Sequence, residues 1–139
     1  MKPLLSSNIY EPKGVVAIVG TCLPQMQAEG FALLMQNVDM VYTLCLEESH
    51  INMAITKIGG MLSTGRMEKL IFATVDRSPH CTQLHYIRHE LERMMPLTIP
   101  VENYVVVENR PILIPNETIE LSKTLSRLAE SENAYQIIK

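Results

Sequence analysis

Residues 14–20 read GVVAIVG, a short and continuous apolar run rich in valine and isoleucine. Such a run is typical of a strand that is buried on both faces. Strands of this kind occur in parallel sheets, because the crossover connections place helices over both faces. The run therefore predicts an interior strand of an α/β sheet.

The same pattern recurs along the chain. Further apolar runs at residues 38–47, 70–76 and 104–108 alternate with segments whose apolar residues recur at helical spacing. A short run at residues 112–115 follows a predicted turn and is expected to pair back as an edge strand, where proline is tolerated. The predicted order is therefore β-α-β-α-β-α-β-β-α.

Alternating strands and helices predict a three-layer α/β/α domain with a mostly parallel, doubly wound sheet. Right-handed crossovers favour the strand order 2-1-3-4, with the short antiparallel strand at the edge. In this topology the chain resembles flavodoxin-like and Rossmann-like domains. We expect one domain over residues 1–139, with an N-terminal extension at 1–13 and a frayed tail at 131–139.

The helices are expected to present apolar faces to this sheet. In the first helix, apolar residues at helical spacing predict the core positions Leu23, Met26, Leu33 and Leu34. Phe31 and Met35 are placed on the opposite face. The third helix is predicted to begin at Ser78–Pro79, a hydroxyl cap followed by proline, and to end before Pro96.

Composition narrows the class of protein. The 139 residues are 47% hydrophobic, which excludes a disordered chain, and the net charge of -3 argues against nucleic-acid binding. No window holds the roughly 18 uninterrupted apolar residues of a membrane helix, and residues 1–14 lack the apolar core of a signal peptide. Three cysteines are too few for a disulfide framework. We therefore expect a cytoplasmic protein without a membrane partner.

In doubly wound sheets, ligands bind at the carboxyl ends of the strands. The predicted ends here carry polar or reactive groups, whereas the predicted beginnings carry few. The segments concerned are Gly20–Cys22, Glu47–His50, Asp76–Cys81 and Glu108–Arg110. These segments predict the site, although turns are polar in many proteins without any function.

Cys22 and Cys81 each fall at or inside the first turn of a predicted helix, where thiol pKa values are lowered. If the first and third strands are neighbours, both cysteines face one crevice. We predict a catalytic set of Cys22, Cys81, Asp76 and His80, assisted by His85. The alternative is that both cysteines are small buried residues. Cys45, within the second run, is expected to be core.

A second pattern involves metal ligands. Cys81, His85 and His89 are spaced four apart, so they share one side of a helix. Cys81 and His85 could bind one metal ion, with Cys22 or His50 completing the coordination. The alternative is a solvated stripe, and His89 in particular is expected to be surface.

The remaining polar residues predict small-molecule binding. The candidates are Gly20, Thr21, His50, Arg77, Ser78 and Arg110. The arginines could bind a carboxylate or phosphate. The dinucleotide fingerprint, the phosphate loop and the serine-hydrolase elbow are all missing from the sequence, so no cofactor is identified.

Methionine-rich helix faces, which include Met53, Met61 and Met67, predict a homo-oligomer or a protein partner. The leading hypothesis is a small α/β protein with a thiol-based site for redox chemistry, sulfur transfer, or metal or iron–sulfur handling. The alternatives are a non-catalytic module that binds a small anion, and a regulatory or structural subunit.

Overall fold

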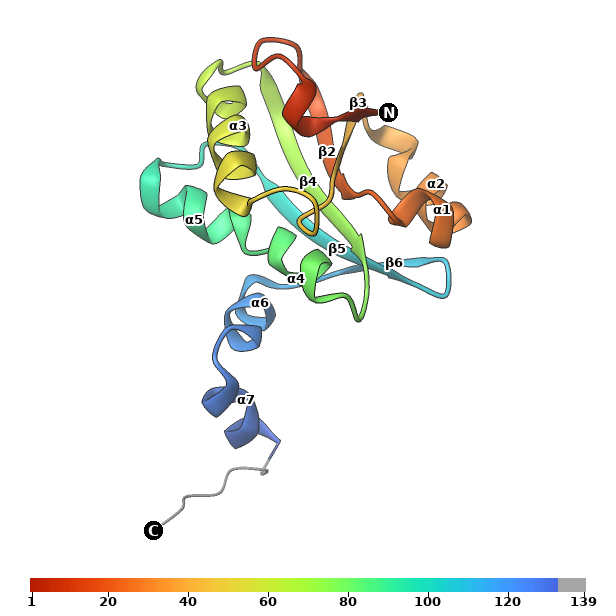
Figure 1. Ribbon diagram of the computed structural model, residues 1–139, viewed down its shortest axis with the longest axis vertical. Helices are drawn as coiled ribbons and strands as arrows, with labels where there is room; N and C mark the ends of the chain where they lie inside the picture. Colours follow the sequence, from red (N-terminus) through yellow and green to blue (C-terminus); the bar gives the residue numbers. More distant parts are fainter. Residues whose placement is uncertain (133–139) are drawn as a thin grey trace.

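The computed structural model describes residues 1–132 and contains a six-stranded sheet with the order β1-β3-β2-β4-β5-β6 (Figure 1). All neighbouring strands are parallel except β5 and β6. The strands are β1 (Lys2–Pro3), β2 (Gly14–Gly20), β3 (Met40–Leu44), β4 (Met67–Val75), β5 (Val101–Val107) and β6 (Arg110–Leu113). The predicted order and antiparallel edge strand are confirmed, since β3, β2, β4 and β5 are the predicted strands 2-1-3-4.

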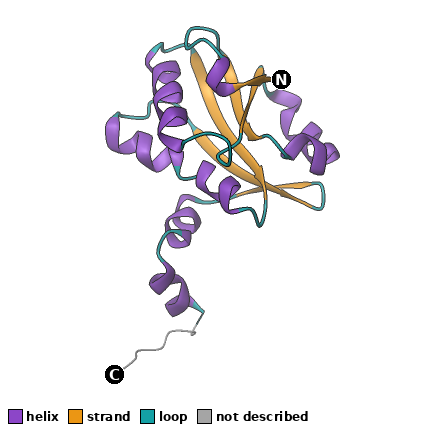
Figure 2. Cartoon of the chain, viewed as in Figure 1, coloured by secondary structure: helices purple, strands orange, loops and turns teal. Residues whose placement is uncertain are grey.

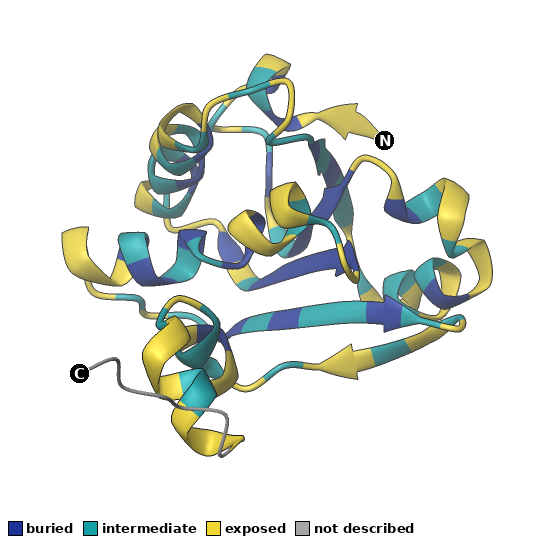
Figure 3. Ribbon diagram, turned by 60° about the horizontal axis from the view of Figure 1, so that its bottom comes forward, coloured by how far each residue is buried: buried dark blue, intermediate teal, exposed yellow. Residues whose placement is uncertain are grey.

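Helices cover both faces of this sheet, as the three-layer prediction requires (Figure 2). They are α1 (Leu23–Met26), α2 (Ala28–Leu34), α3 (Ile51–Ser63), α4 (Pro79–Leu84), α5 (Ile87–Met94), α6 (Asn116–Ser122) and α7 (Leu125–Ser131), with the 3-10 helices η1 (Leu4–Ser6) and η2 (Met35–Asn37). Ile58 of α3 and Leu91 of α5 pack in one core cluster with Phe72 of the sheet. Leu23 of α1 packs in the other cluster with Ala73. Figure 3 shows buried residues concentrated on the central strands.

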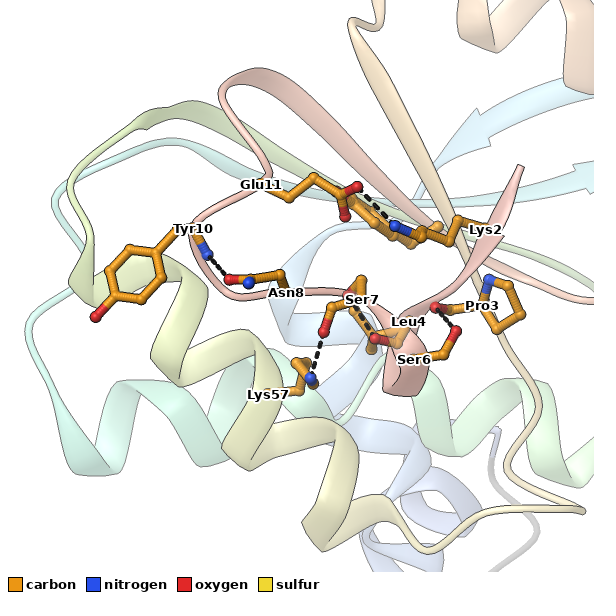
Figure 4. Close-up of polar contacts among 10 residues, drawn as sticks. Lys2, Pro3, Leu4, Ser6, Ser7, Asn8, Tyr10, Glu11 and Lys57 are labelled. Carbon is orange, nitrogen blue, oxygen red and sulfur yellow. Dashed lines mark hydrogen bonds and ion pairs between the residues drawn. The ribbon is translucent and has the colours of Figure 1, made fainter.

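The N-terminal extension is part of the fold. Its strand β1 adds a parallel edge to β3, and Leu4 is fully buried. Lys57 of α3 donates a hydrogen bond to the carbonyl oxygen of Ser7 at 2.5 Å, and Lys2 pairs with Glu11 at 2.7 Å (Figure 4). These contacts attach residues 1–13 to the edge of the sheet and to α3.

Three predicted helices are each divided in two. The first breaks at Gln27, whose backbone (φ -134, ψ 56) is not helical. This break changes which face of the helix meets the sheet, so the predicted core residues Met26 and Leu33 are exposed. Phe31 and Met35, predicted to lie opposite the core, are half-buried against it. Leu23 is buried and Leu34 is half-buried against the core, as predicted. The predicted face is therefore confirmed for these two residues and wrong for the other four.

The C-terminal segment is also divided, into α6 and α7. Ile119 of α6 is buried, whereas Leu125 of α7 is 80% exposed. Figure 1 shows α7 extending away from the sheet. Of the predicted frayed tail, residues 131–132 end this helical region, and residues 133–139 lie outside the described residues.

Within residues 1–132, no helix is both long and apolar enough to cross a lipid bilayer.

Candidate functional site

The carboxyl ends of β2, β3 and β4 lie side by side at one edge of the sheet. Gly20 and Leu44, the last residues of β2 and β3, are register partners. The N–H of Thr21 donates to the carbonyl oxygen of Leu44 at 3.2 Å, which continues the pairing past the end of β2. This pairing brings together the segments that follow both strands.

Cys81 packs directly against the end of β2. Its Sγ lies 3.4 Å from the position that a Cβ atom would occupy on Gly20, and the Cγ2 of Thr74 lies 3.6 Å from the same point. Cys81 is the third residue of α4, and its N–H donates to the Oγ of the capping residue Ser78 at 3.4 Å. The half-buried thiol therefore lies at van der Waals distance from the end of β2.

All three cysteines are free thiols at this edge. Cys22 precedes the first residue of α1 and is exposed. Cys45 follows the last residue of β3 and is half-buried. The prediction that Cys45 is a core residue in mid-strand was wrong, because β3 ends one residue before it. Sequence reasoning placed Cys45 inside the strand, since the apolar run continues past the true end of β3.

His85 is buried in the sheet-facing turn between α4 and α5. Its Nδ1 lies 2.8 Å from Oδ1 of Asn103, and its Nε2 lies 2.8 Å from Oγ1 of Thr74. Burial lowers the pKa of His85, while the bond to Asn103 and the charge of Asp76 oppose this shift. The alternative prediction of a solvated stripe was wrong, because the helix breaks at His85 and turns its ring inward.

The surroundings of His85 bear on the predicted metal site. Both of its ring nitrogens already have protein partners, so neither is free to join Cys81 at a metal ion. In the part of the chain that the structure describes, no group of three or more His, Cys, Asp or Glu side chains is arranged to hold a metal ion. The proposed pair of Cys81 and His85 therefore gains no support.

His89 is buried, which corrects the prediction that it lies on the surface. Its Nδ1 lies 3.2 Å from Oε1 of Glu120 on α6, although neither ring nitrogen forms a well-directed hydrogen bond. His89 thus belongs to the contact between α5 and α6.

The predicted polar residues separate into different places. Asp76 is exposed and accepts a hydrogen bond from the N–H of Arg77 at 3.0 Å. Arg77 lies two residues past the end of β4 and has a left-handed backbone (φ 68). His80, next to Cys81, is exposed, and His50 is exposed at the start of α3.

Arg110 lies on the β5–β6 hairpin, 3.5 Å from Glu108. β5 separates this hairpin strand from β4, whose end carries Arg77. Arg77 therefore follows β4, whereas Arg110 is the first residue of β6.

A cavity of about 190 Å³ lies beside this edge, between the ends of β4 and β5 and the helices α4 and α6. Thr74, Asp76 and His85 line it together with Tyr86 and Ser122. Asn103, which is not among the lining residues, accepts a hydrogen bond from Nδ1 of His85. Sequence reasoning missed Thr74 and Asn103. A polar residue inside the apolar run at 70–76 was the signal for Thr74, whereas Asn103 precedes the run at 104–108 and had no such signal.

A family model for the Rossmann-like domain matches residues 12–137 of the chain. No curated protein and no solved structure gives a significant match. The matched range covers every strand from β2 to β6 and the edge at which the cysteines lie. The chain therefore belongs to the family of Rossmann-like domains.

Proposed function

We propose that this Rossmann-like domain carries out thiol–disulfide chemistry at the carboxyl edge of β2 and β4. The observation that carries the proposal is the packing of the Cys81 thiol on Gly20, two residues before the exposed Cys22. The half-buried thiol is thereby held beside the segment that presents the accessible one. Access decides which thiol reacts first in an exchange, and here Cys22 is exposed whereas Cys81 is half-buried.

The proposed reaction is an exchange with a small disulfide. The thiolate of Cys22 attacks one sulfur atom of the substrate, whose other sulfur leaves as a thiol after taking up a proton. The thiolate of Cys81 then attacks Cys22 in this mixed disulfide and releases the second thiol. The substrate gains two electrons and two protons, and the protein is left with a Cys22–Cys81 disulfide.

His80 and Asp76, the other two residues of the predicted catalytic set, lie in different surroundings. His80 is exposed and directly precedes Cys81. We therefore propose His80 as the group that receives the proton of the Cys81 thiol. Asp76 faces the cavity and its charge acts on His85, so we do not assign it a role in the exchange.

Oxidation in a graded series of glutathione redox buffers tests the proposal. We expect peptide mapping under non-reducing conditions to find a Cys22–Cys81 disulfide, and a trapped glutathione on Cys22 in the Cys81→Ser variant. Cys45→Ser is the matched control and should oxidise as the unchanged protein does.

Independent glutathionylation of all three cysteines, without an internal disulfide, would contradict the exchange. Added sulfur on Cys22 in protein purified without oxygen would assign sulfur transfer instead.

A further inference from the structure

The cavity between β4, β5, α4 and α6 is separate from the thiol edge, because no cysteine lines it. Five hydroxyl groups line it: those of Thr74, Thr82, Tyr86, Thr118 and Ser122. Where the hydrogen of each hydroxyl points decides whether the cavity offers donors or acceptors to a ligand.

On the α4 side of the cavity, the hydroxyl groups donate their hydrogens to protein acceptors. The hydroxyl of Thr82 donates to the carbonyl oxygen of Ser78 at 3.0 Å. His85 must carry a proton on Nδ1, since Nδ1 faces the amide oxygen of Asn103. The neutral ring that burial favours then has a bare Nε2, which accepts the hydrogen of Thr74 at 2.8 Å. Thr74 and Thr82 are left with oxygen lone pairs.

The α6 side follows the same rule. The hydroxyl of Ser122 donates to the carbonyl oxygen of Ile119 at 2.6 Å. The contact of 3.3 Å between Tyr86 and Ser122 must therefore have the tyrosine as its donor. Of the five lining hydroxyls, four donate their hydrogens to protein acceptors. The fifth, on Thr118, belongs to an exposed residue.

The charged group in the cavity wall also favours a ligand that donates hydrogen bonds. Asp76 supplies a carboxylate, and no lysine or arginine is among the lining residues. An anion placed here would face the carboxylate of Asp76. The ammonium group of Lys123 lies outside the lining, over the ring of Tyr86 at 5.3 Å from its centroid. Val105, Ile114 and Ile119 provide an apolar wall, which a hydrated metal ion would not use.

We propose that this cavity binds a small primary amine in its ammonium form. The ammonium group has three donors and no acceptor, which complements the carboxylate of Asp76 and the oxygens of Thr74 and Thr82. Its short alkyl chain lies against Val105 and Ile114. The volume of about 190 Å³ equals roughly six water molecules at about 30 Å³ each, so the chain is limited to a few carbon atoms.

Titration of the full chain with propylamine, 1-propanol and propionate at one pH and ionic strength tests the proposal. We expect propylammonium to produce saturable NMR shifts at the amides of residues 74–76, 82–86 and 118–122. Propanol should bind about tenfold more weakly, because it lacks the charge-assisted hydrogen bonds, and propionate should leave these amides unchanged.

Two variants locate the binding. Asp76→Asn removes an exposed charge and should weaken propylammonium binding about tenfold. Glu108→Gln, an exposed acid outside the cavity, should leave binding unchanged. Shifts of equal size with propanol or propionate, shifts produced by sodium or potassium chloride alone, or no response at these amides would overturn the proposal. A variant with all three cysteines replaced by serine should still bind, which separates this site from the proposed thiol function.

Discussion

The Nδ1 atom of His85 lies 2.8 Å from the Oδ1 atom of Asn103, and both side chains are buried. This contact joins the turn between α4 and α5 to β5, across 18 positions of sequence. It also determines the direction of the hydrogen bond between His85 and Thr74. The proton on Nδ1 leaves Nε2 to accept the hydrogen of Thr74, so it determines which hydrogen-bonding groups the cavity wall presents.

Replacement of Asn103 by leucine should destabilise the fold by about 1–3 kcal/mol, because a buried N–H of His85 then lacks an acceptor. Urea unfolding measures this loss directly. Asn37→Ala, at an exposed position, is the control and should change the free energy of unfolding by less than about 0.5 kcal/mol. An Asn103→Leu protein as stable as the unchanged chain would mean that the contact contributes nothing.

Stability should fall as the pH drops below 6.5, the ordinary pKa of histidine. Burial lowers the pKa of His85 in the folded chain, so the unfolded chain binds more protons in this range. The contribution is fully present above pH 6.5 and is lost toward the lowered pKa of the folded state. Unfolding midpoints measured between about pH 8 and pH 5 should show a smaller slope for His85→Gln than for the unchanged chain. Equal slopes would show that His85 is not the group responsible.

A Gly20→Ala variant should fold, since the new Cβ would lie 3.4 Å from Sγ of Cys81 and 3.6 Å from Cγ2 of Thr74. These are ordinary contact distances, and we expect a change in unfolding free energy below about 1 kcal/mol. The added methyl group should slow alkylation of Cys81 and leave that of Cys22 unchanged. Reagent labelling followed by mass spectrometry separates the two rates. Unaltered labelling of Cys81 would argue against the close packing of its thiol on β2.

Gly30→Ala should be far more harmful. A Cβ on Gly30 would overlap Cγ1 of Val106 and would lie 2.8 Å from the backbone carbon of Asn109. The N–H of Gly30 also donates to Oδ1 of Asn109 at 3.2 Å, so α2 sits tightly on the β5–β6 hairpin. We expect a loss of about 1–3 kcal/mol, visible as a lower thermal midpoint. Gly65→Ala is less suitable as a control, because Gly65 has a positive φ of 70. Ala32→Gly, on the exposed face of the same helix, should cost only about 1 kcal/mol.

We also expect the chain to self-associate through the outer face of α3. Met61 and Met67, part of the predicted methionine surface, are buried, so only Met53 of that trio remains exposed. Met53 borders an open groove of about 630 Å³ between α3 and the N-terminal segment. Light scattering at several concentrations should show a mass that rises with concentration. Met53→Lys should shift this rise to higher concentration, and a strict monomer at all concentrations would contradict the prediction.

The predictions that succeeded depended on local patterns with few competing interpretations. The apolar block that begins at Gly14 became β2, which ends at Gly20, one residue before the predicted end at Thr21. A continuous valine-rich run has few alternatives in a buried sheet. The strand order followed from the right-handed crossover rule once the alternation of strands and helices was recognised. The position of Cys81 beside the end of β2 was expected from the same rule.

The failures came from breaks within helices. The four-residue spacing of Cys81, His85 and His89 suggested one side of a continuous helix, but the chain turns at His85 and Tyr86. This turn points His85 toward Asn103, a partner on another element that periodicity cannot reveal. Cys45 was misplaced for a related reason, since hydropathy continued beyond the last strand pairing at Leu44.

The sequence by itself determined the class of fold, the order of the strands and the edge of the sheet at which reactive side chains gather. These properties follow from hydrophobic periodicity and backbone chirality, which act over short stretches of chain. Only the tertiary structure decided which side chains face one another, such as Cys81 with Gly20 and His85 with Thr74 and Asn103. Those pairings depend on packing and hydrogen-bond satisfaction between elements distant in sequence, and buried polar groups take the partners that the assembled fold provides.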